Sequence, residues 1–385
     1  MAKEYKYLYQ RMLDEEVIRE AYKKLRKGKT KRTEIMYIDA NLDEEVRKMK
    51  EMIRNTKPAE IAVEHPEKAY VPLKREPKYV NEHGKLRKIY MPEIHEQWLH
   101  HVIIEILEPI ITATAYRYSC GSFPRRGAHY GKRRLERWVR EGKDIRNFGK
   151  IDIRHFYDSI RPEILERELR IRIKDEWFIY VIMLCLQGFK KGVPLGFYIS
   201  QWLANYLLEP LDRFIMDKLG IRIFIRYMDD MVFFKNAKKD LQNAIIQIRM
   251  FIGRRFRLKL KGNYTVAKFD YEKKNGKKIG RCVDFMGFKF FRDRTTIRKN
   301  IMISATGLAA KMHREKENRR GYYRKHITAM LSYMGWFTCT DTYSVYLDRI
   351  KPLIRVKQLK QIISKLDRRD KKHERMVERA LLCAA

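Results

Sequence analysis

Hydrophobic and polar positions follow two different periods along the chain, and these periods predict a mixture of helices and strands. Apolar residues recur at helical spacing over residues 1–60 and again over 95–110, HEQWLHHVIIEILEPI. Residues 68–92 predict a β-ribbon whose second arm carries basic side chains. A loop interrupted by glycine and proline, within 119–142, leads into a basic helix. The first part of the chain is therefore expected to be mainly helical, with one ribbon.

The middle of the chain predicts strands that alternate with helices. The predicted order is a short strand within 148–160, helices at 161–190 and 200–218, a hairpin at 221–234, a helix at 239–256, a basic strand at 257–263 and a second hairpin at 285–298. From about residue 303 the pattern is helical, basic and amphipathic. This order predicts an α+β fold, in which a mixed sheet has helices on one face and carries a helical appendage.

Two adjacent carboxylates, Asp229 and Asp230, interrupt the apolar hairpin IRIFIRYM-DD-MVFF. A turn alone would explain aspartates at the tip, but tight hairpin turns prefer Asn-Gly or Asp-Gly. Like charges a few ångströms apart repel unless a cation lies between them. A pair of divalent metal ions would fit, and it calls for a third carboxylate on a neighbouring strand. Asp152 in KIDIRHFY is the candidate, although an isolated aspartate at a strand end is often only a cap.

The segment KGVPLGFYISQWLAN (191–205) lies between the two acidic strands. Gly192, Pro194 and Gly196 predict a rigid loop with little side-chain bulk, which allows a ligand to approach the backbone closely. Ser200 and Gln201 could donate hydrogen bonds near the start of the next helix. The simpler interpretation is an ordinary loop with a capping serine.

Composition narrows the class of partner. The 385 residues carry a formal net charge of +37, and 45% of them are hydrophobic, so the chain can build a large core and is expected to bind nucleic acid. A basic ribosomal-type protein would look similar, so charge alone does not indicate an enzyme. Neither a signal peptide nor a long apolar run is evident, and no membrane partner is expected. The five cysteines are scattered, which fits a reducing cytoplasm better than disulfides or a zinc site.

The motifs D-x-x-x-F-Y, G-x-x-x-S-Q, Y-M-D-D and F-M-G-F-K-F occur in that order between about residues 70 and 300. Together they resemble a bacterial reverse transcriptase. The resemblance implies the right-hand polymerase fold, with fingers and an N-terminal helical region at 1–150, a palm at 151–292, and a helical basic thumb with a C-terminal tail at 293–385. Part of about 160–190, within the palm range, would belong to the fingers. It also implies an RNA-directed DNA polymerase that uses two Mg²⁺ ions, with Mn²⁺ as a possible substitute, and that binds dNTPs, an RNA template and a DNA or RNA primer.

The resemblance also implies roles for single residues. The catalytic metal ligands would be Asp152, Asp229 and Asp230, with Ile153 in the metal site. The nucleotide would be bound by Lys85, Arg87, Tyr157, Gly196, Gln201 and Lys259. Primer or template would contact Tyr227, Met228, Met286, Gly287, Arg125 and Arg126. Within these sets, Tyr157 matches the sugar-sensing position, and Lys259 or Lys261 falls near the proton donor to pyrophosphate. For each basic residue, a solvated side chain or a contact with the phosphate backbone is an equal alternative.

The segment LGFYISQ most resembles the reverse transcriptases of diversity-generating retroelements, a lineage related to group II introns, although Leu195 and Phe197 stand where Ile and Asn are usual. SYMGWFTCTDTY (332–343) is similar to their thumb. This resemblance implies a bacterial or phage-encoded enzyme with a dedicated RNA template and a small basic accessory protein. Two alternatives stay open. One is a prophage or antiviral-defence reverse transcriptase with its own noncoding RNA, and the other is a non-catalytic RNA-binding scaffold derived from a polymerase.

Overall fold

The computed structural model describes residues 3–384 apart from 59, 73–75, 83–84, 143–144, 190, 274 and 319–320, and leaves out the side chains of 82, 85, 371–375 and 377–384. The chain divides into two compact units, and each takes three separate segments. Unit 1 comprises Met1–Gly127, Ile151–Met231 and Asn243–Tyr264, and unit 2 comprises Ala128–Lys150, Val232–Gln242 and Thr265–Ala385. The division into fingers, palm and thumb stays a prediction.

The N-terminal part of unit 1 is helical, as predicted. Its helices are α1 (Leu8–Met12), α2 (Glu15–Arg26), α3 (Thr33–Ala40), α4 (Leu42–Asn55) and α5 (Ile94–Thr112), with a 3₁₀ turn η1 at Pro66–Lys68. Helix α2 begins after Asp14, whose side chain accepts a hydrogen bond from the Glu16 amide, and its apolar face packs against α5. Trp98 is fully buried between them and donates from Nε1 to the Ile18 carbonyl (2.9 Å). These helices form a packed core in which α5 contacts α1 and α2.

The predicted ribbon is present as β1 (Lys78–Glu82) and β2 (Lys85–Ile89), which pair antiparallel with Lys78 opposite Ile89. The predicted helical segment at 161–190 is two helices, α8 (Pro162–Arg172) and α9 (Glu176–Cys185). The break falls at Asp175, whose side chain accepts from the Phe178 amide and caps α9. Helix α10 (Tyr198–Arg213) continues into a π-helical turn, η2 (Phe214–Lys218).

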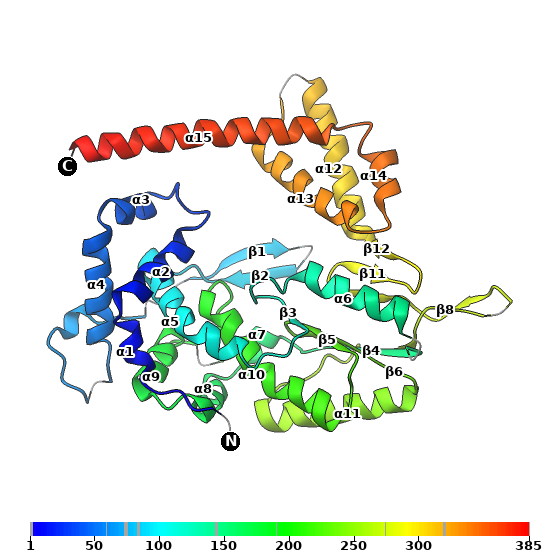
Figure 1. Cartoon of the computed structure of the whole chain (residues 1–385), viewed down its shortest axis with the longest axis horizontal. Coiled ribbons are helices and arrows are strands. Elements are labelled where there is room, and N and C mark those ends of the chain that lie inside the picture. Colours follow the sequence, from blue (N-terminus) through cyan, green and yellow to red (C-terminus); the bar gives the residue numbers. More distant parts are fainter. Residues whose placement is uncertain are drawn as a thin grey trace. The chain divides into compact units, whose positions relative to one another are not determined.

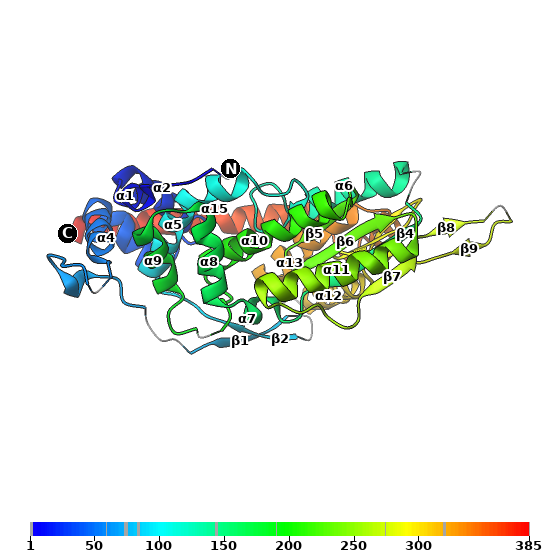
Figure 2. The same cartoon turned by 90° about the horizontal axis from the view of Figure 1, so that it is seen from below.

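The central sheet has the strand order β3-β5-β6-β4-β7. Its strands are β3 (Ser119–Cys120), β4 (Asn147–Asp152), β5 (Phe224–Tyr227), β6 (Asp230–Lys235) and β7 (Thr265–Lys268). Strands β3 and β5 are parallel, whereas β4 and β7 are antiparallel, so the sheet is mixed. Helix α11 (Lys238–Phe256) lies across one face of β5 (Figures 1 and 2). The mixed sheet and its helices confirm the α+β class.

One predicted strand is wrong. Residues 257–263 form only a single bridge, between Leu260 and Ile153, and the paired strand β7 starts at Thr265. Burial still alternates as the pattern indicated, because Leu258 and Leu260 are buried while Arg257 and Lys259 are exposed. The segment therefore packs like a strand without the backbone ladder that defines one.

Unit 2 holds two small sheets and the C-terminal helices. The predicted hairpin at 285–298 is three antiparallel strands, β10 (Val283–Phe285), β11 (Phe288–Phe290) and β12 (Thr295–Ile297). Strands β8 (Tyr271–Glu272) and β9 (Lys278–Ile279) pair separately. The helices are α6 (Ala128–Glu141), α12 (Lys299–Glu317), α13 (Arg324–Thr338), α14 (Tyr343–Arg349) and α15 (Val356–Ala384). Helix α13 packs against α12, α14 and α15, which confirms the helical C-terminal pattern.

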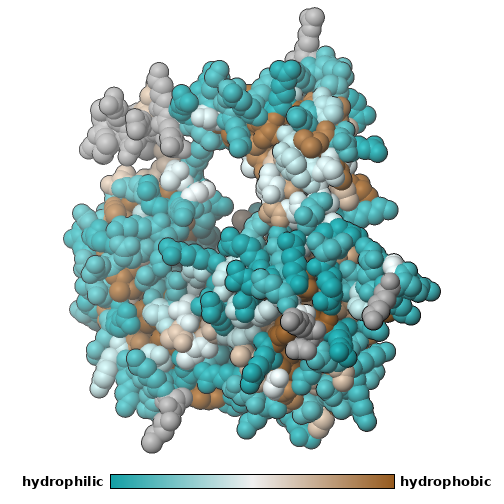
Figure 3. Space-filling model, turned by 45° about the vertical axis from the view of Figure 1, so that its right-hand side comes forward, coloured by the Kyte–Doolittle hydropathy of each residue, from teal (hydrophilic) through white to brown (hydrophobic). Residues whose placement is uncertain are grey.

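One face of the molecule is mainly polar, as the charge predicts. Hydrophilic residues dominate the face shown in Figure 3, and apolar residues are scattered among them. None of the helices in the described part of the chain combines the length and apolar character that crossing a bilayer would require. Cys120, Cys185, Cys282 and Cys339 are free thiols.

Candidate active site

The predicted acidic residues lie at the ends of neighbouring strands in unit 1. Strand β4 ends at Asp152, and the tip of the hairpin between β5 and β6 is formed by Met228 and Asp229, so that Asp230 already begins β6. The turn is thus one residue earlier than the sequence indicated. Lys261 approaches Asp152 twice, because its amide donates to the Asp152 carbonyl (2.8 Å) and its ammonium forms an ion pair with Oδ2.

The side chain of Asp229 lies close enough to Asp152 for the two charges to interact. Burial, together with the smaller effect of the negative charge of Asp152, raises the pKa of Asp229 to about 7. Two carboxylates that must share a poorly solvated place favour either a proton or a cation between them.

The donors present fit a hard divalent cation. Within the described chain, Oδ1 of Asp152 is buried and accepts no hydrogen bond, which leaves one oxygen available as a ligand. The side chain of Ile153 is a hydrocarbon, so only its backbone carbonyl oxygen could be a ligand. Among the described residues, however, no group of three or more His, Cys, Asp and Glu side chains is placed to hold a metal ion. A cation here would be bound by few protein ligands, as is usual for Mg²⁺ shared with substrate phosphates.

The turn that carries Asp229 is strained and tightly packed. Met228 has φ of +55°, an uncommon conformation for a residue with a side chain. A Cβ on Gly121 would lie 3.1 Å from Met228 Cγ, so glycine leaves the room that Met228 fills. Ser122 Oγ and Asn205 Nδ2 contact Met228 Sδ at 3.4 and 3.5 Å. The turn is held by these contacts in one conformation.

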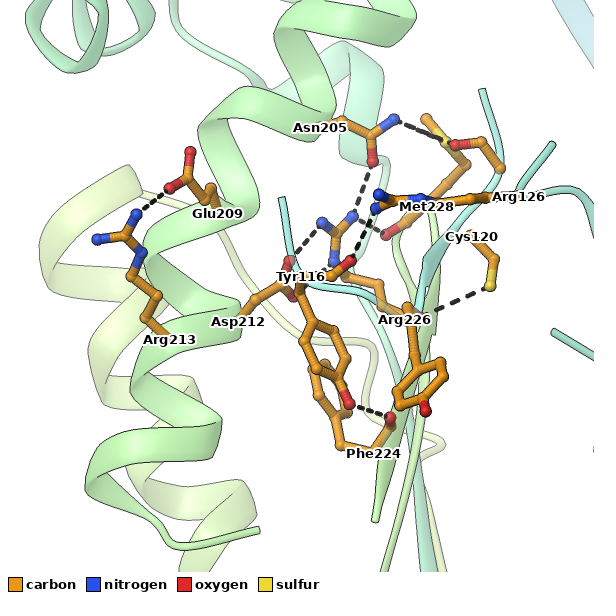
Figure 4. A network of polar contacts seen from close by, with 12 residues as sticks. Tyr116, Cys120, Arg126, Asn205, Glu209, Asp212, Arg213, Phe224, Arg226 and Met228 are labelled. Carbon is orange, nitrogen blue, oxygen red and sulfur yellow. Dashed lines mark hydrogen bonds and ion pairs between the residues drawn. The ribbon is translucent and has the colours of Figure 1, made fainter. Parts of the chain in front are cut away.

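A buried arginine two residues before Met228 anchors the same turn (Figure 4). Arg226 is 1% exposed and donates Nε and Nη2 to the two oxygens of Asp212 on α10, at 2.7 and 2.6 Å. Its Nη1 donates to Asn205 Oδ1 (3.0 Å) and to the Met228 carbonyl (2.9 Å). One guanidinium therefore joins the helix to the backbone beside Asp229. The sequence analysis missed this role, and the only signal was a charge in an otherwise apolar strand.

The predicted nucleotide-binding residue Tyr157 lies within electrostatic reach of Asp229, and a second one, Arg87, lies within reach of Tyr157. Burial raises the pKa of Tyr157, on α7 (Phe156–Ser159), and the charge of Asp229 adds to the shift. The positive charge of Arg87, on β2, lowers the same pKa, so the guanidinium lies within electrostatic reach of the ring. Phe156 is 3% exposed and is a core residue, as expected. The side chain of Lys85 lies outside the described residues.

The glycine-rich loop contacts the ribbon rather than standing free. Gly196 has φ of +103°, and a Cβ there would overlap the Tyr90 carbonyl and lie 2.9 Å from Ile89 Cγ2. The Tyr90 amide donates to the Leu195 carbonyl (2.7 Å). Ser200 does not cap the helix; its hydroxyl donates back to the Pro194 carbonyl (2.7 Å), while Gln201 Oε1 accepts from Ser122 Oγ (2.9 Å). The loop is thereby fixed between the ribbon and α10.

Replacing Gly196 by Ala should break this contact, and Gly188→Ala is the matched control. Both glycines have φ above +90°, but a Cβ on Gly188 would meet nothing within 4 Å. We expect Gly188→Ala to lower the free energy of unfolding by about 1 kcal/mol, and Gly196→Ala by about 1–3 kcal/mol more. Urea unfolding of both variants measures the difference; equal losses would show that the loop is not wedged against the ribbon.

The predicted primer-contacting residues divide between the two units. In unit 2, Met286 (φ +51°) and Gly287 (φ +88°) form the turn between β10 and β11. A Cβ on Gly287 would lie 2.6 Å from the ring of Trp336 on α13, so the missing side chain makes room for an indole of the same unit. This packing explains the glycine without a primer strand, and the primer contact stays a prediction.

The remaining predicted residues are in unit 1. Arg125 is exposed, and Arg126 lies over the Phe123 ring (5.6 Å) and donates to the Tyr116 carbonyl (3.4 Å). Tyr227 is half-buried. Lys259 is exposed and does not contact Asp152, which pairs with Lys261 instead.

Comparison with known proteins identifies one family profile that matches more than half of the chain. The profile of the family described as "Reverse transcriptase (RNA-dependent DNA polymerase)" matches residues 74–290. Protein YkfC of Escherichia coli (strain K12) is 24% identical over 171 residues, which cover 39% of this chain and 42% of YkfC. The chain therefore matches less than half of that relative's length.

Two solved structures are similar at a lower level. Telomerase from Candida tropicalis, in complex with a TWJ fragment of telomeric RNA, is 12% identical with a TM-score of 0.44, over 79% of this chain and 57% of that one. Telomerase from Candida albicans, with the same kind of fragment, is 11% identical with a TM-score of 0.43, over 72% and 56%.

Proposed function

The chain belongs to the reverse transcriptase family, whose profile spans more than half of it, and on this premise we propose that it is an RNA-directed DNA polymerase that copies a dedicated RNA template. The proposal rests mainly on the proximity of two carboxylates, Asp152 at the end of β4 and Asp229 in the turn before β6. Burial and mutual repulsion hold the pKa of Asp229 near 7, so the pair is suited to bind a cation at physiological pH. A protein that only bound RNA would gain nothing from carboxylates that face a polyanion.

The residues of the site divide the work of nucleotidyl transfer. Asp152 and Asp229 would hold Mg²⁺, and Asp230 would join them, as the family motif implies. Mg²⁺, when bound, supplies positive charge that favours ionisation of the primer 3′-hydroxyl and offsets the charge of the leaving pyrophosphate. Lys261 holds Asp152 in place through its ion pair, and Arg226 fixes the turn beside Asp229. Catalysis then rests mainly on positioning and on fixed charge.

Tyr157 would select the sugar of the incoming nucleotide, as the family motif implies, and its support is that the charges of Asp229 and Arg87 both act on its hydroxyl. Tyr157→Ala should open the space that a 2′-hydroxyl needs and raise the use of ribonucleotides relative to deoxynucleotides by about 10–100-fold. The ratio of kcat/KM for rNTP and dNTP measures this. Tyr157→Phe keeps the ring and should keep the selectivity; a ratio unchanged in the alanine variant would remove Tyr157 from sugar selection.

The subclass rests on the segments LGFYISQ and SYMGWFTCTDTY, which favour a diversity-generating retroelement over a defence-associated enzyme. An RNA partner fits the net charge of +37, which would bind the template–primer duplex through its phosphates. If the chain belongs to a diversity-generating retroelement, a small basic accessory protein would be its protein partner.

The test is primer extension on an RNA template with Mg²⁺ and dNTPs, followed by sequencing of the product. RNA-dependent DNA synthesis supports the polymerase, and errors concentrated opposite template adenines support the retroelement subclass. Faithful or repetitive products would favour the defence role. No synthesis, either on a generic template or on RNA purified with the protein from its host, would favour the non-catalytic scaffold.

A further inference from the structure

A cavity of about 370 Å³ in unit 1 is lined by side chains of one charge. Its volume lies in the range of small-molecule sites. Within the described chain none of its lining residues is acidic, and Ser159 adds a hydroxyl. The cationic lining is formed by Arg154, Arg161, Lys191, Arg257 and Lys259, with His155 beside them. Five like charges around one cavity repel each other, and an anion between them would offset that repulsion.

The charges of this basic pocket are available to a ligand. Arg161 has only a long contact with Glu163 (3.7 Å), and in the described chain the other four cations form no ion pair. All five cationic side chains are exposed, whereas two buried arginines of unit 1 have acidic partners, since Arg172 pairs with Glu209 and Arg226 with Asp212. The basic pocket is thus a group of positive charges that has almost no acidic partner within the described part of unit 1.

The backbone builds the basic pocket from segments that are distant in sequence. The Arg154 amide donates to the Lys259 carbonyl (2.8 Å), and the Gly192 amide donates to the Ile160 carbonyl (2.7 Å), which brings Lys191 to Arg161. His155 and Arg257 have φ of +45° and +57°. Residues with side chains rarely adopt this conformation, and such strain gathers at functional sites. These constraints fix the backbone from which the exposed cationic side chains extend.

Two of these segments also carry Asp152, the proposed catalytic carboxylate, and its partner Lys261. Arg154 follows Asp152 by two residues, and Lys259 precedes Lys261, the partner of Asp152, by two residues. Nucleotidyl transfer at Asp152 would form the bond between the primer O3′ and the α-phosphorus. It would break the bond from that phosphorus to the oxygen bridging to the β-phosphate, and release pyrophosphate. The hydroxyl proton leaves to water. The reaction therefore releases a multiply charged anion at Asp152, which is two residues from the pocket residue Arg154 along the sequence.

We propose that the basic pocket binds pyrophosphate outside the reacting position and receives it as it leaves. The inference rests on the proposed function for the source of the anion. The binding itself does not, because the cations are present whether or not the chain makes DNA. The chemistry recognised is a linked diphosphate, which is shared by free pyrophosphate and by the tail of a nucleoside triphosphate.

Calorimetric titration of the full-length protein with inorganic pyrophosphate in EDTA tests the binding without metal or turnover. The pocket variant is Arg161→Gln/Lys191→Gln/Arg257→Gln. The control variant, Lys218→Gln/Arg222→Gln/Arg254→Gln, removes the same charge from exposed positions of unit 1 outside the basic pocket. We expect the pocket variant to bind pyrophosphate at least about tenfold more weakly than the control. Equal affinities of the two variants would overturn the proposal. Lys191→Glu alone serves if the triple variant does not fold.

Further measurements identify the source of the anion. Product inhibition by pyrophosphate should weaken in the pocket variant while the KM for dNTP stays the same. A raised KM with unchanged inhibition would assign the basic pocket to the incoming triphosphate and overturn its exit role. Weaker binding of an RNA–DNA duplex with unchanged pyrophosphate binding would assign it to nucleic acid and overturn the proposal. If the chain makes no DNA but binds pyrophosphate, and the pocket variant does not, the pyrophosphate site is supported and the proposed function is overturned.

Discussion

The Asp229→Asn variant should lose RNA-templated DNA synthesis, with a rate at least about a thousandfold lower, or on the order of 4 kcal/mol of transition-state stabilisation. Asparagine has nearly the shape of aspartate but no charge, so it removes a cation ligand and leaves the strained turn in place. Steady-state primer extension in Mg²⁺ measures the loss. Asp217→Asn removes an exposed carboxylate of unit 1 and should keep full activity. More than a tenth of the native rate in Asp229→Asn would rule out the carboxylate pair as the catalytic centre.

The same variant should be more stable than the native chain when divalent cations are absent. The folded protein raises the pKa of Asp229 from about 3.8 to about 7, so the ionised form is disfavoured in the folded state. That penalty is absent below about pH 4, grows as pH rises to about 7 and is constant above it. Thermal unfolding in EDTA should therefore show Asp229→Asn gaining stability over the native chain between pH 4 and 7. Parallel pH profiles would contradict the burial of this charge.

Changes at Arg226 should have the second largest effect. Arg226→Met alone leaves Asp212 as an unpaired buried charge and should cost about 3–5 kcal/mol of stability. Arg226→Lys keeps the charge but cannot reach both Asp212 oxygens, Asn205 and the Met228 carbonyl together. We expect the lysine variant to fold, with kcat about 10–100-fold lower and a nearly unchanged KM for dNTP.

A paired replacement separates support of the turn from support of the fold. Arg226→Met/Asp212→Leu replaces the buried ion pair with apolar side chains and should recover most of the stability lost in Arg226→Met. It still leaves the Met228 carbonyl without its donor, so activity should stay low. Urea unfolding and primer extension on the same preparations give both readings. Recovery of activity together with stability would show that Arg226 acts only on the fold.

The sequence predicted those parts of the site that depend on local pattern. Asp152 and Asp229 could be found because a charge inside an apolar strand needs a partner, and the helices and ribbon followed from their periods. The strand at 257–263 was misplaced because alternation reports burial, whereas a strand also needs a backbone partner that the sequence does not show. The break at Asp175 was missed because the helical periods on either side of it run together.

Contacts between distant segments could not be predicted. Arg226 is visible as a charge in strand β5, but nothing local selects Asp212 among the 48 acidic residues of the chain. Gly287 was assigned to the primer because glycine allows close approach, and only the packed structure shows that Trp336 occupies the space. Both cases depend on which side chains meet after folding, and a single sequence does not contain that information directly.

The interleaving of the two units along the chain sets the order in which they can fold during synthesis. Unit 1 begins at the N-terminus but needs residues up to Tyr264, while the first segment of unit 2, Ala128–Lys150, is made long before the last one starts at Thr265. During that interval β4, whose Gly149 lies against Phe233 of β6, lacks its antiparallel partner β7. Exposed apolar strands are prone to aggregate, and pairing over long sequence separations is slow. We therefore expect unit 2 to fold only after the residues that follow Thr265 have been made, and chaperones to raise the yield of active protein.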